Sequence, residues 1–198
     1  ILERIKSEAA SIGEAYSVLE ASLELARSRL RAGDAPGGLA ILNDARDAAG
    51  GVPSHFAARF AYVEALIRIE LGELDEADMR LGQAIRVLRA SNNAGDSIFA
   101  ELQAGRLMVE RGRCDAAAAI LERIKSEAAS IGEAFSVLEA SLELARSTLR
   151  AGDAPGALAI LNDASDAAGG VPTHYPARIA YVEAIIRSEL RELYEPGR

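Results

Sequence analysis

The sequence has a single cysteine, Cys114, no tryptophan and few aromatic residues of any kind. One cysteine excludes an intrachain disulfide and is typical of a reducing compartment, so we predict a cytoplasmic location. Basic residues are in the minority, because 22 Lys and Arg stand against 30 Asp and Glu, and the net charge of −8 disfavours a phosphate backbone as partner. No apolar run approaches the roughly 20 residues that cross a bilayer. We therefore predict no nucleic-acid partner and no membrane partner.

Sequence signatures of catalysis are also absent. Neither a G-x-x-x-x-G-K-[ST] loop nor a G-x-G-x-x-G loop occurs, so a nucleotide site has no support. His55 and His174 stand 119 residues apart, which is the offset at which the chain repeats itself. We therefore predict that each is a residue of a helix first turn, and not a metal ligand. Cys114 has no histidine within a helical turn of it in the sequence. We therefore predict that Cys114 is a small packed residue and not a nucleophile. We predict that the chain is not an enzyme, has no catalytic, cofactor-binding or metal-binding residues, and uses no cofactor.

What the sequence contains instead is a repeat. Residues 1–79 return with substitutions as residues 120–198, and the segment ILERIKSEAASIGEA occurs unchanged from Ile1 and from Ile120. A shorter period lies inside this long one. Similar turns recur at Gly33, Gly72, Gly112 and Gly152, with a degraded one at Arg191. The unit is therefore about 40 residues long, which is typical of helical solenoids.

Each unit is predicted to contain two helices. The abundance of Ala, Leu, Glu and Arg favours helix over strand. A turn glycine can end one helix, and an aspartate such as Asp34 or Asp153 can cap the next. We expect first helices at 13–32, 54–71, 96–111, 132–151 and 173–190, and second helices at 35–49, 74–90, 114–130 and 154–168. The predicted units are 13–50, 54–91, 96–131, 132–169 and, in part, 173–198.

Small residues recur at fixed distances from the turn glycines, for example Ala26 before Gly33 and Gly38 after it. Such residues let two antiparallel helices approach closely. Together with the turn sequences GDAPG, GELDEA and GRCDAA, this pattern resembles the tetratricopeptide repeat (TPR). The unit is longer than the ~34 residues of that repeat, and is similar to units in the sensor region of MalT-type bacterial transcription activators and in kinesin light chains. Glu64 and Glu183 depart from the pattern, because an apolar residue is usual at their positions.

The predicted fold class is all-α, with residues 1–198 forming one right-handed α-solenoid of antiparallel helix pairs. The resemblance implies that the first helix of each pair lines a concave groove. Arginine and tyrosine are enriched at binding hot spots, and a row of arginines suits an acidic, partly apolar peptide. Carried over to this sequence, the groove positions combine arginines with apolar and aromatic side chains: Arg27, Arg59, Tyr62, Leu66, Phe99, Leu102, Arg106, Arg146, Arg178 and Tyr181.

Two alternatives remain open for the groove arginines. They pair either with a ligand or with glutamates of the groove itself, such as Glu70, Glu110 and Glu189. A Lys/Asn carboxylate clamp, as in chaperone-binding relatives, is missing. Apolar residues fill its positions: Leu23, Tyr62, Leu102 and Leu142.

The leading functional hypothesis is a non-catalytic scaffold that binds a protein or peptide of acidic character and is part of a larger bacterial regulator. The alternative is a self-assembling or engineered repeat protein, in which the exposed ends of the solenoid mediate homo-oligomerisation.

Overall fold

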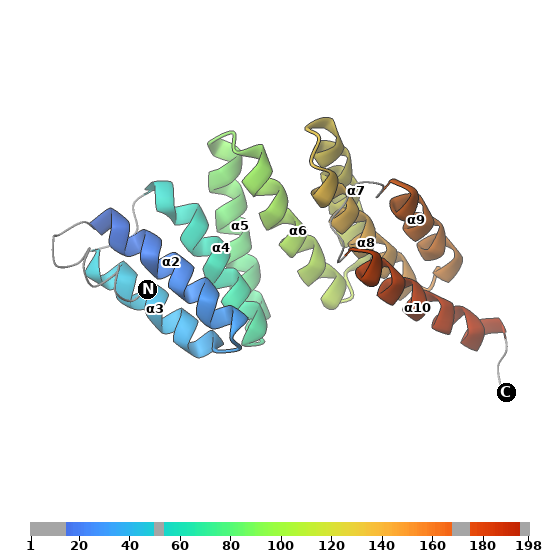
Figure 1. The fold of residues 1–198 in the computed structure, drawn as a ribbon, viewed down its shortest axis with the longest axis horizontal. Helices are drawn as coiled ribbons and strands as arrows, with labels where there is room; N and C mark the ends of the chain where they lie inside the picture. Colours follow the sequence, from blue (N-terminus) through green and yellow to red (C-terminus); the bar gives the residue numbers. More distant parts are fainter. Residues whose placement is uncertain (1–14, 50–53, 168–174, 195–198) are drawn as a thin grey trace. The chain divides into compact units, whose positions relative to one another are not determined.

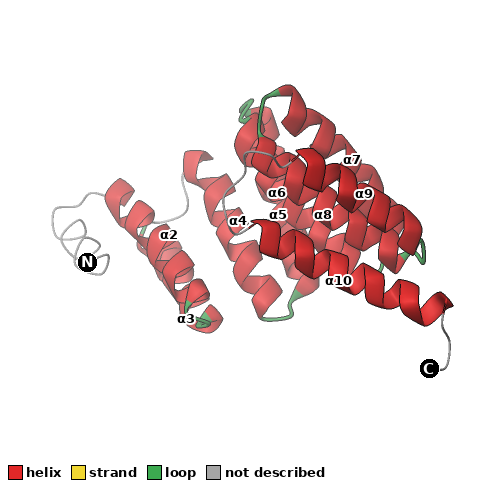
Figure 2. Cartoon of the chain, turned by 45° about the vertical axis from the view of Figure 1, so that its right-hand side comes forward, coloured by secondary structure: helices red, strands yellow, loops and turns green. Residues whose placement is uncertain are grey.

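The computed structural model describes residues 15–49, 54–167 and 175–194, and these residues form helices joined by short turns (Figures 1 and 2). No strand occurs in this part of the chain, so the all-α prediction is confirmed. The helices begin and end within a few residues of their predicted positions. They are α2 (Ala15–Arg31), α3 (Ala35–Ala48), α4 (Ser54–Glu70), α5 (Leu74–Ala90), α6 (Ala94–Glu110), α7 (Cys114–Ser130), α8 (Ala134–Arg150), α9 (Ala154–Ala167) and α10 (Tyr175–Tyr194).

The chain divides into two compact units, Ile1–Ala100 and Glu101–Arg198, with the boundary inside α6. In the first unit α2 packs against α3, α4 packs against α5, and α2 also contacts α4. In the second unit α8 packs against both α7 and α9, and α10 packs against α9. Helices that follow one another form antiparallel pairs. That the whole of residues 1–198 forms one right-handed solenoid stays a prediction.

The turns between paired helices follow the predicted chemistry. Gly33 and Gly152 have φ angles of +78° and +90°, in the left-handed region that glycine adopts without strain. Asp34 then caps α3, because its Oδ1 accepts a hydrogen bond from the backbone N–H of Gly37 at 2.9 Å. Asp153 caps α9 in the same way, with 2.8 Å from the Gly156 nitrogen to its Oδ1.

Replacing Asp153 with alanine is expected to lower the free energy of unfolding by about 1 kcal/mol, because α9 loses its side-chain cap. Arg113 is the matched control. It stands at the equivalent position before α7 and makes no side-chain cap hydrogen bond, so Arg113→Ala should change stability by less than about 0.5 kcal/mol. Urea unfolding followed by far-UV circular dichroism measures both. Equal effects of the two substitutions would contradict the assigned cap.

Two hydrophobic clusters, one in each unit, are built from the same repeated residues. Small residues allow close packing in both units: a Cβ added at Gly38 would lie 3.2 Å from the Ala26 carbonyl oxygen, and one at Gly105 would lie 2.8 Å from Leu121 Cδ2. The first cluster contains Leu19, Leu23, Ala26, Leu42, Ala45, Val63 and Ile67. The second contains their counterparts Leu138, Leu142, Ala145, Leu161, Ala164, Val182 and Ile186. The long sequence repeat is thus also a repeat of the core.

Candidate functional site

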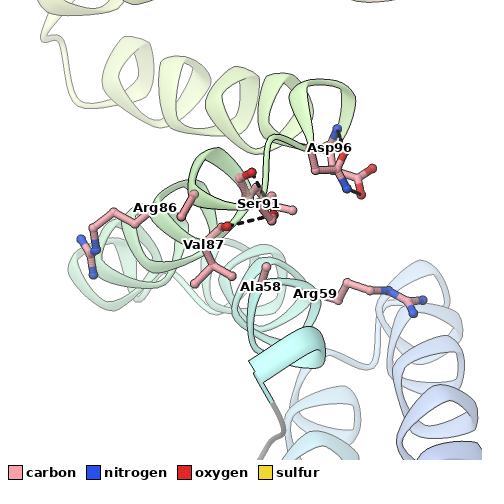
Figure 3. A pocket seen from close by; sticks show the side chains of 9 residues that line it. Ala58, Arg59, Arg86, Val87, Ser91 and Asp96 are labelled. Atoms are coloured by element: carbon pink, nitrogen blue, oxygen red, sulfur yellow. Dashed lines mark hydrogen bonds between the residues drawn. The ribbon is translucent and has the colours of Figure 1, made fainter.

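A hollow in the first unit brings together several of the predicted groove residues. One cavity has a volume of about 330 Å³ and lies beside Arg27 on α2, Arg59 and Tyr62 on α4, and Phe99 on α6. A neighbouring cavity of about 610 Å³ continues it toward the end of α5 and the turn before α6 (Figure 3). The two cavities share Ala58, Arg59, Leu88 and Asp96 in their linings, and we call them together the α4–α6 hollow. Its remaining lining residues are Ala58, Arg86, Val87, Leu88, Ala90, Ser91, Asn93 and Asp96.

The floor and rim of the α4–α6 hollow are held by local packing and capping. Ala58, Leu88 and Ala100 form a small buried cluster, and Tyr62 packs against it. At the rim, the Asn93 side chain caps α6. Its Oδ1 accepts from the backbone N–H of Asp96 at 3.2 Å, and its Nδ2 donates to the Asp96 carboxylate at 2.7 Å. The hollow therefore offers an apolar floor and a rim whose polar groups are fixed in place.

Arg59 is already engaged by acidic residues of α2. Its two terminal nitrogens donate to the two carboxylate oxygens of Glu20 at 2.5 and 2.7 Å, and Glu24 lies 3.9 Å away. The hydrogen bond from Arg59 lowers the pKa of the Glu20 carboxyl, although burial opposes this effect. Figure 3 shows Arg59 extending from α4 toward the neighbouring helix, while Arg86 extends away on the opposite side of the hollow.

The other predicted arginines whose side chains the structure describes also contact glutamates. Arg27 pairs with Glu24 at 2.7 Å. In the second unit, Arg106 contacts both Glu139 and Glu143, with 3.0 Å between its Nε and a Glu143 oxygen. Arg146 pairs with Glu143 at 2.8 Å. The sequence left open whether the groove arginines pair with a ligand or with glutamates of the protein. In this structure they pair with glutamates of the protein.

The glutamates that fill this role are not the ones proposed from the sequence. In the described part of the chain, the groove arginines pair with other glutamates than Glu70 and Glu110, and the side chain of Glu189 lies outside the described residues. The partners of Arg59 and Arg106 lie on a neighbouring first helix, whereas those of Arg27 and Arg146 lie three residues away on the same helix. Arg59 and Glu20 are 39 residues apart, about one repeat. A search for acid and base residues one period apart would have found this pair.

The remaining predicted groove residues divide between the two units. Leu66 is half-buried on α4. In the second unit Leu102 is buried and offers little surface to a ligand, whereas Tyr181 on α10 is 69% exposed. The side chain of Arg178 lies outside the described residues. The structure therefore gathers Arg27, Arg59, Tyr62 and Phe99 at one hollow, and does not add the others to it.

A buried ion cluster surrounds Glu64, one of the two residues that departed from the repeat pattern. Its side chain is 1% exposed, and three arginines reach it from three helices: Arg46 on α3 at 2.8 Å, Arg68 on α4 at 2.8 Å and Arg80 on α5 at 3.1 Å. Burial raises the pKa of the Glu64 carboxyl, but the hydrogen bond from Arg68 and the charges of Arg80 and Arg46 outweigh burial and hold the pKa below its ordinary value. These contacts explain an acid at an apolar position.

No group of three or more His, Cys, Asp and Glu residues is arranged to hold a metal ion in the described part of the chain. Among the described helices, none is long and apolar enough to cross a membrane. Cys114, at the start of α7, is half-buried with a free thiol.

Comparison with known proteins identifies the fold. No protein-family model matches the sequence, and no curated protein matches it. The structure is similar to a crystal structure of nearly identical TPR-like repeats of a putative kinesin light chain from Podosopora anserina, with a TM-score of 0.69 over 84% of this chain and 83% of that chain. Because the sequences are 20% identical, this likeness shows the fold alone.

The chain is a helical repeat protein with a TPR-like fold. Proteins with such repeats generally bind proteins or peptides and are typically non-catalytic. The similarity to MalT-type regulators stays a prediction, as does the absence of catalytic, cofactor and metal sites.

Proposed function

We propose that this chain is a non-catalytic scaffold that binds a protein or peptide segment in the α4–α6 hollow. One observation carries the proposal: an open hollow of several hundred cubic ångströms lies against the first helices of the repeats and is lined by Tyr62 and Phe99 over an apolar floor. Cavities of this volume are typical of ligand sites. Aromatic side chains supply large contact area with little loss of conformational freedom, which favours them as anchors for a bound segment.

The proposed ligand carries both an apolar side chain and a carboxylate. The apolar side chain packs against Phe99, which is 37% exposed, and over the buried cluster beneath it. The carboxylate exchanges with Glu20 as partner of Arg59. Both side chains of this pair are about one-third exposed, and exposed ion pairs are worth at most about 1 kcal/mol, so the exchange costs little. The planar guanidinium donates two parallel hydrogen bonds to one carboxylate.

Replacing Phe99 with alanine is expected to weaken binding of acidic–apolar peptides by about tenfold, because an aromatic anchor is lost. The probes are short peptides composed of Glu, Asp, Leu and Phe, and a matched set in which Gln and Asn replace the acids. Isothermal titration of the full chain gives the affinities. Tyr181→Ala is the control, because Tyr181 is an exposed aromatic residue that is not among the lining residues of the hollow.

The possible outcomes test the location of the binding site and its preference for acidic peptides separately. Binding that survives Phe99→Ala unchanged, or no binding of either peptide set, would contradict the hollow as the site. Equal affinity for the acidic and the neutral set would contradict only the carboxylate contact. Membership of a larger bacterial regulator stays a prediction that these experiments do not address.

A further inference from the structure

The smaller cavity of the α4–α6 hollow is lined by charged side chains of both signs. They are Arg27, Arg59 and Asp96. The two arginines already form ion pairs, Arg27 with Glu24 and Arg59 with Glu20. Asp96 differs from them, because no basic side chain of the described residues forms an ion pair with its carboxylate. The hollow therefore contains an anion whose charge is not yet balanced by a partner from the described part of the chain.

The turn before α6 fixes the position of the Asp96 carboxylate. One carboxylate oxygen accepts a hydrogen bond from Asn93 Nδ2 at 2.7 Å, and the backbone N–H of Asp96 donates to Asn93 Oδ1 at 3.2 Å. The side chain is exposed, and the residue before it is Gly95, where an added Cβ would meet no atom of the described residues within 4 Å. The carboxylate is thus held in one orientation and remains open to approach from solvent.

Helix α5 makes the surroundings of Asp96 more favourable for a cation. The last turn of α5 borders the larger cavity through Val87, Leu88 and Ala90, and Asp96 lines the same cavity. Backbone carbonyls at the C-terminus of a helix carry partial negative charge and favour a cation near them. Arg86 also lines this cavity, but its side chain extends away on the opposite side of the hollow from Asp96 (Figure 3).

We propose that the segment bound in the α4–α6 hollow carries a cationic nitrogen group, from a basic side chain or a free amino terminus, that pairs with Asp96. The inference rests on the proposed function and adds a positive charge to the acidic and apolar groups of the ligand. Its basis is charge complementarity. A ligand cation gains Asp96 without displacing another ion-pair partner, whereas a ligand carboxylate displaces Glu20 from Arg59. Of the two charged contacts, the one with Asp96 therefore requires less rearrangement of the protein.

An acid in the first turn of a helix also stabilises that helix without any ligand, because it lies near the positive end of the helix dipole. Asp115 has such a position in α7, is exposed, and is not among the lining residues of the hollow. Asp115→Asn is therefore the matched control for Asp96→Asn, since each removes one charge from a first turn. Asp96→Asn keeps a side-chain oxygen that can accept from Asn93, so the turn before α6 should be preserved.

The test is a double-mutant cycle measured by isothermal titration of the full chain. The probes are peptides of Leu and Phe with a lysine on one side and a glutamate on the other, made in both orders and blocked at both ends. In the matched peptides norleucine replaces the lysine. The parent chain should bind the lysine peptide about three- to fivefold more tightly than the norleucine peptide. Asp96→Asn should remove this preference and Asp115→Asn should keep it. The preference should also shrink between about 0.05 M and about 0.5 M salt, because salt screens an exposed ion pair.

A norleucine peptide with a free amino terminus distinguishes the two sources of the cation. Tighter binding of this peptide than of its blocked form, lost in Asp96→Asn, would assign the contact to a chain end. The inference is overturned if neither the lysine nor the free amino terminus strengthens binding, or if the gain is the same in the parent and in Asp96→Asn. Weaker binding in Phe99→Ala without any such dependence on Asp96 would overturn this inference and leave the proposed function standing. No binding of any of these peptides would overturn both.

Discussion

Replacing Arg106 with alanine is expected to lower the free energy of unfolding of the second unit by about 3–5 kcal/mol. Arg106 is the cation that bridges Glu139 and Glu143, two carboxylates one turn apart on α8 whose side chains are almost completely buried. Without Arg106 the two buried carboxylates lose a shared positive charge in a medium that solvates them poorly, although Glu143 keeps its ion pair with Arg146. Urea unfolding of the full chain, followed by far-UV circular dichroism and by hydrogen exchange of α8 peptides, measures the loss.

Arg27→Ala is the matched control for this prediction. Arg27 pairs with Glu24 as Arg146 pairs with Glu143, but on α2, where the glutamate side chain is 37% exposed instead of 3%. Its loss should therefore cost less than about 1 kcal/mol. The combined variant Arg106→Met/Glu139→Leu/Glu143→Leu should recover most of the stability lost in Arg106→Ala, because no buried charge remains. If Arg106→Ala and Arg27→Ala cost the same, the bridge between α6 and α8 is not the stabilising contact described above.

The helices of this protein follow from its sequence, because each rests on local signals that repeat. The turn glycines, the caps at Asp34 and Asp153 and the high helix propensity of the intervening segments all act within a few residues. Such signals place helix ends without knowledge of the tertiary structure. The copies also strengthen each assignment, since a turn at Gly33 that returns at Gly152 is supported twice.

The electrostatic network could not be predicted in the same way. Arg59 and Glu20 meet because α4 lies beside α2, and Arg106 reaches α8 for the corresponding reason. These contacts depend on how the side chains of neighbouring first helices interleave. The repeat spacing fixes the relative position of two such helices only to within about one helical turn, so it does not determine which side chains meet. Sequence alone therefore pointed to arginines in the first helices, but two of the glutamates that it suggested as their partners, Glu70 and Glu110, are not the ones that contact them. It also marked Glu64 as unusual without showing that arginines from three helices converge on it.

Replacing Glu64 with glutamine is expected to lower the free energy of unfolding of the first unit by about 3 kcal/mol at neutral pH. The substitution leaves the cationic groups of Arg46, Arg68 and Arg80 close together without the carboxylate that they share. Glu183→Gln is the matched control, because Glu183 is the counterpart of Glu64 in the second copy. Its side chain is 33% exposed and pairs with Arg187 at 2.6 Å, so its loss should cost less than about 1 kcal/mol.

The effect of Glu64 should also depend on pH in a definite direction. Its pKa in the folded chain lies below the ordinary value of 4.5, because the three arginines outweigh the effect of burial. A carboxyl with a lowered pKa contributes its full stability above the ordinary value and loses it as pH falls through the folded pKa. The parent chain should therefore lose stability below about pH 4.5, and the difference between parent and Glu64→Gln should shrink over the same range. A difference that stays constant from pH 7 to about pH 2 would show that Glu64 acts by packing and not by its charge.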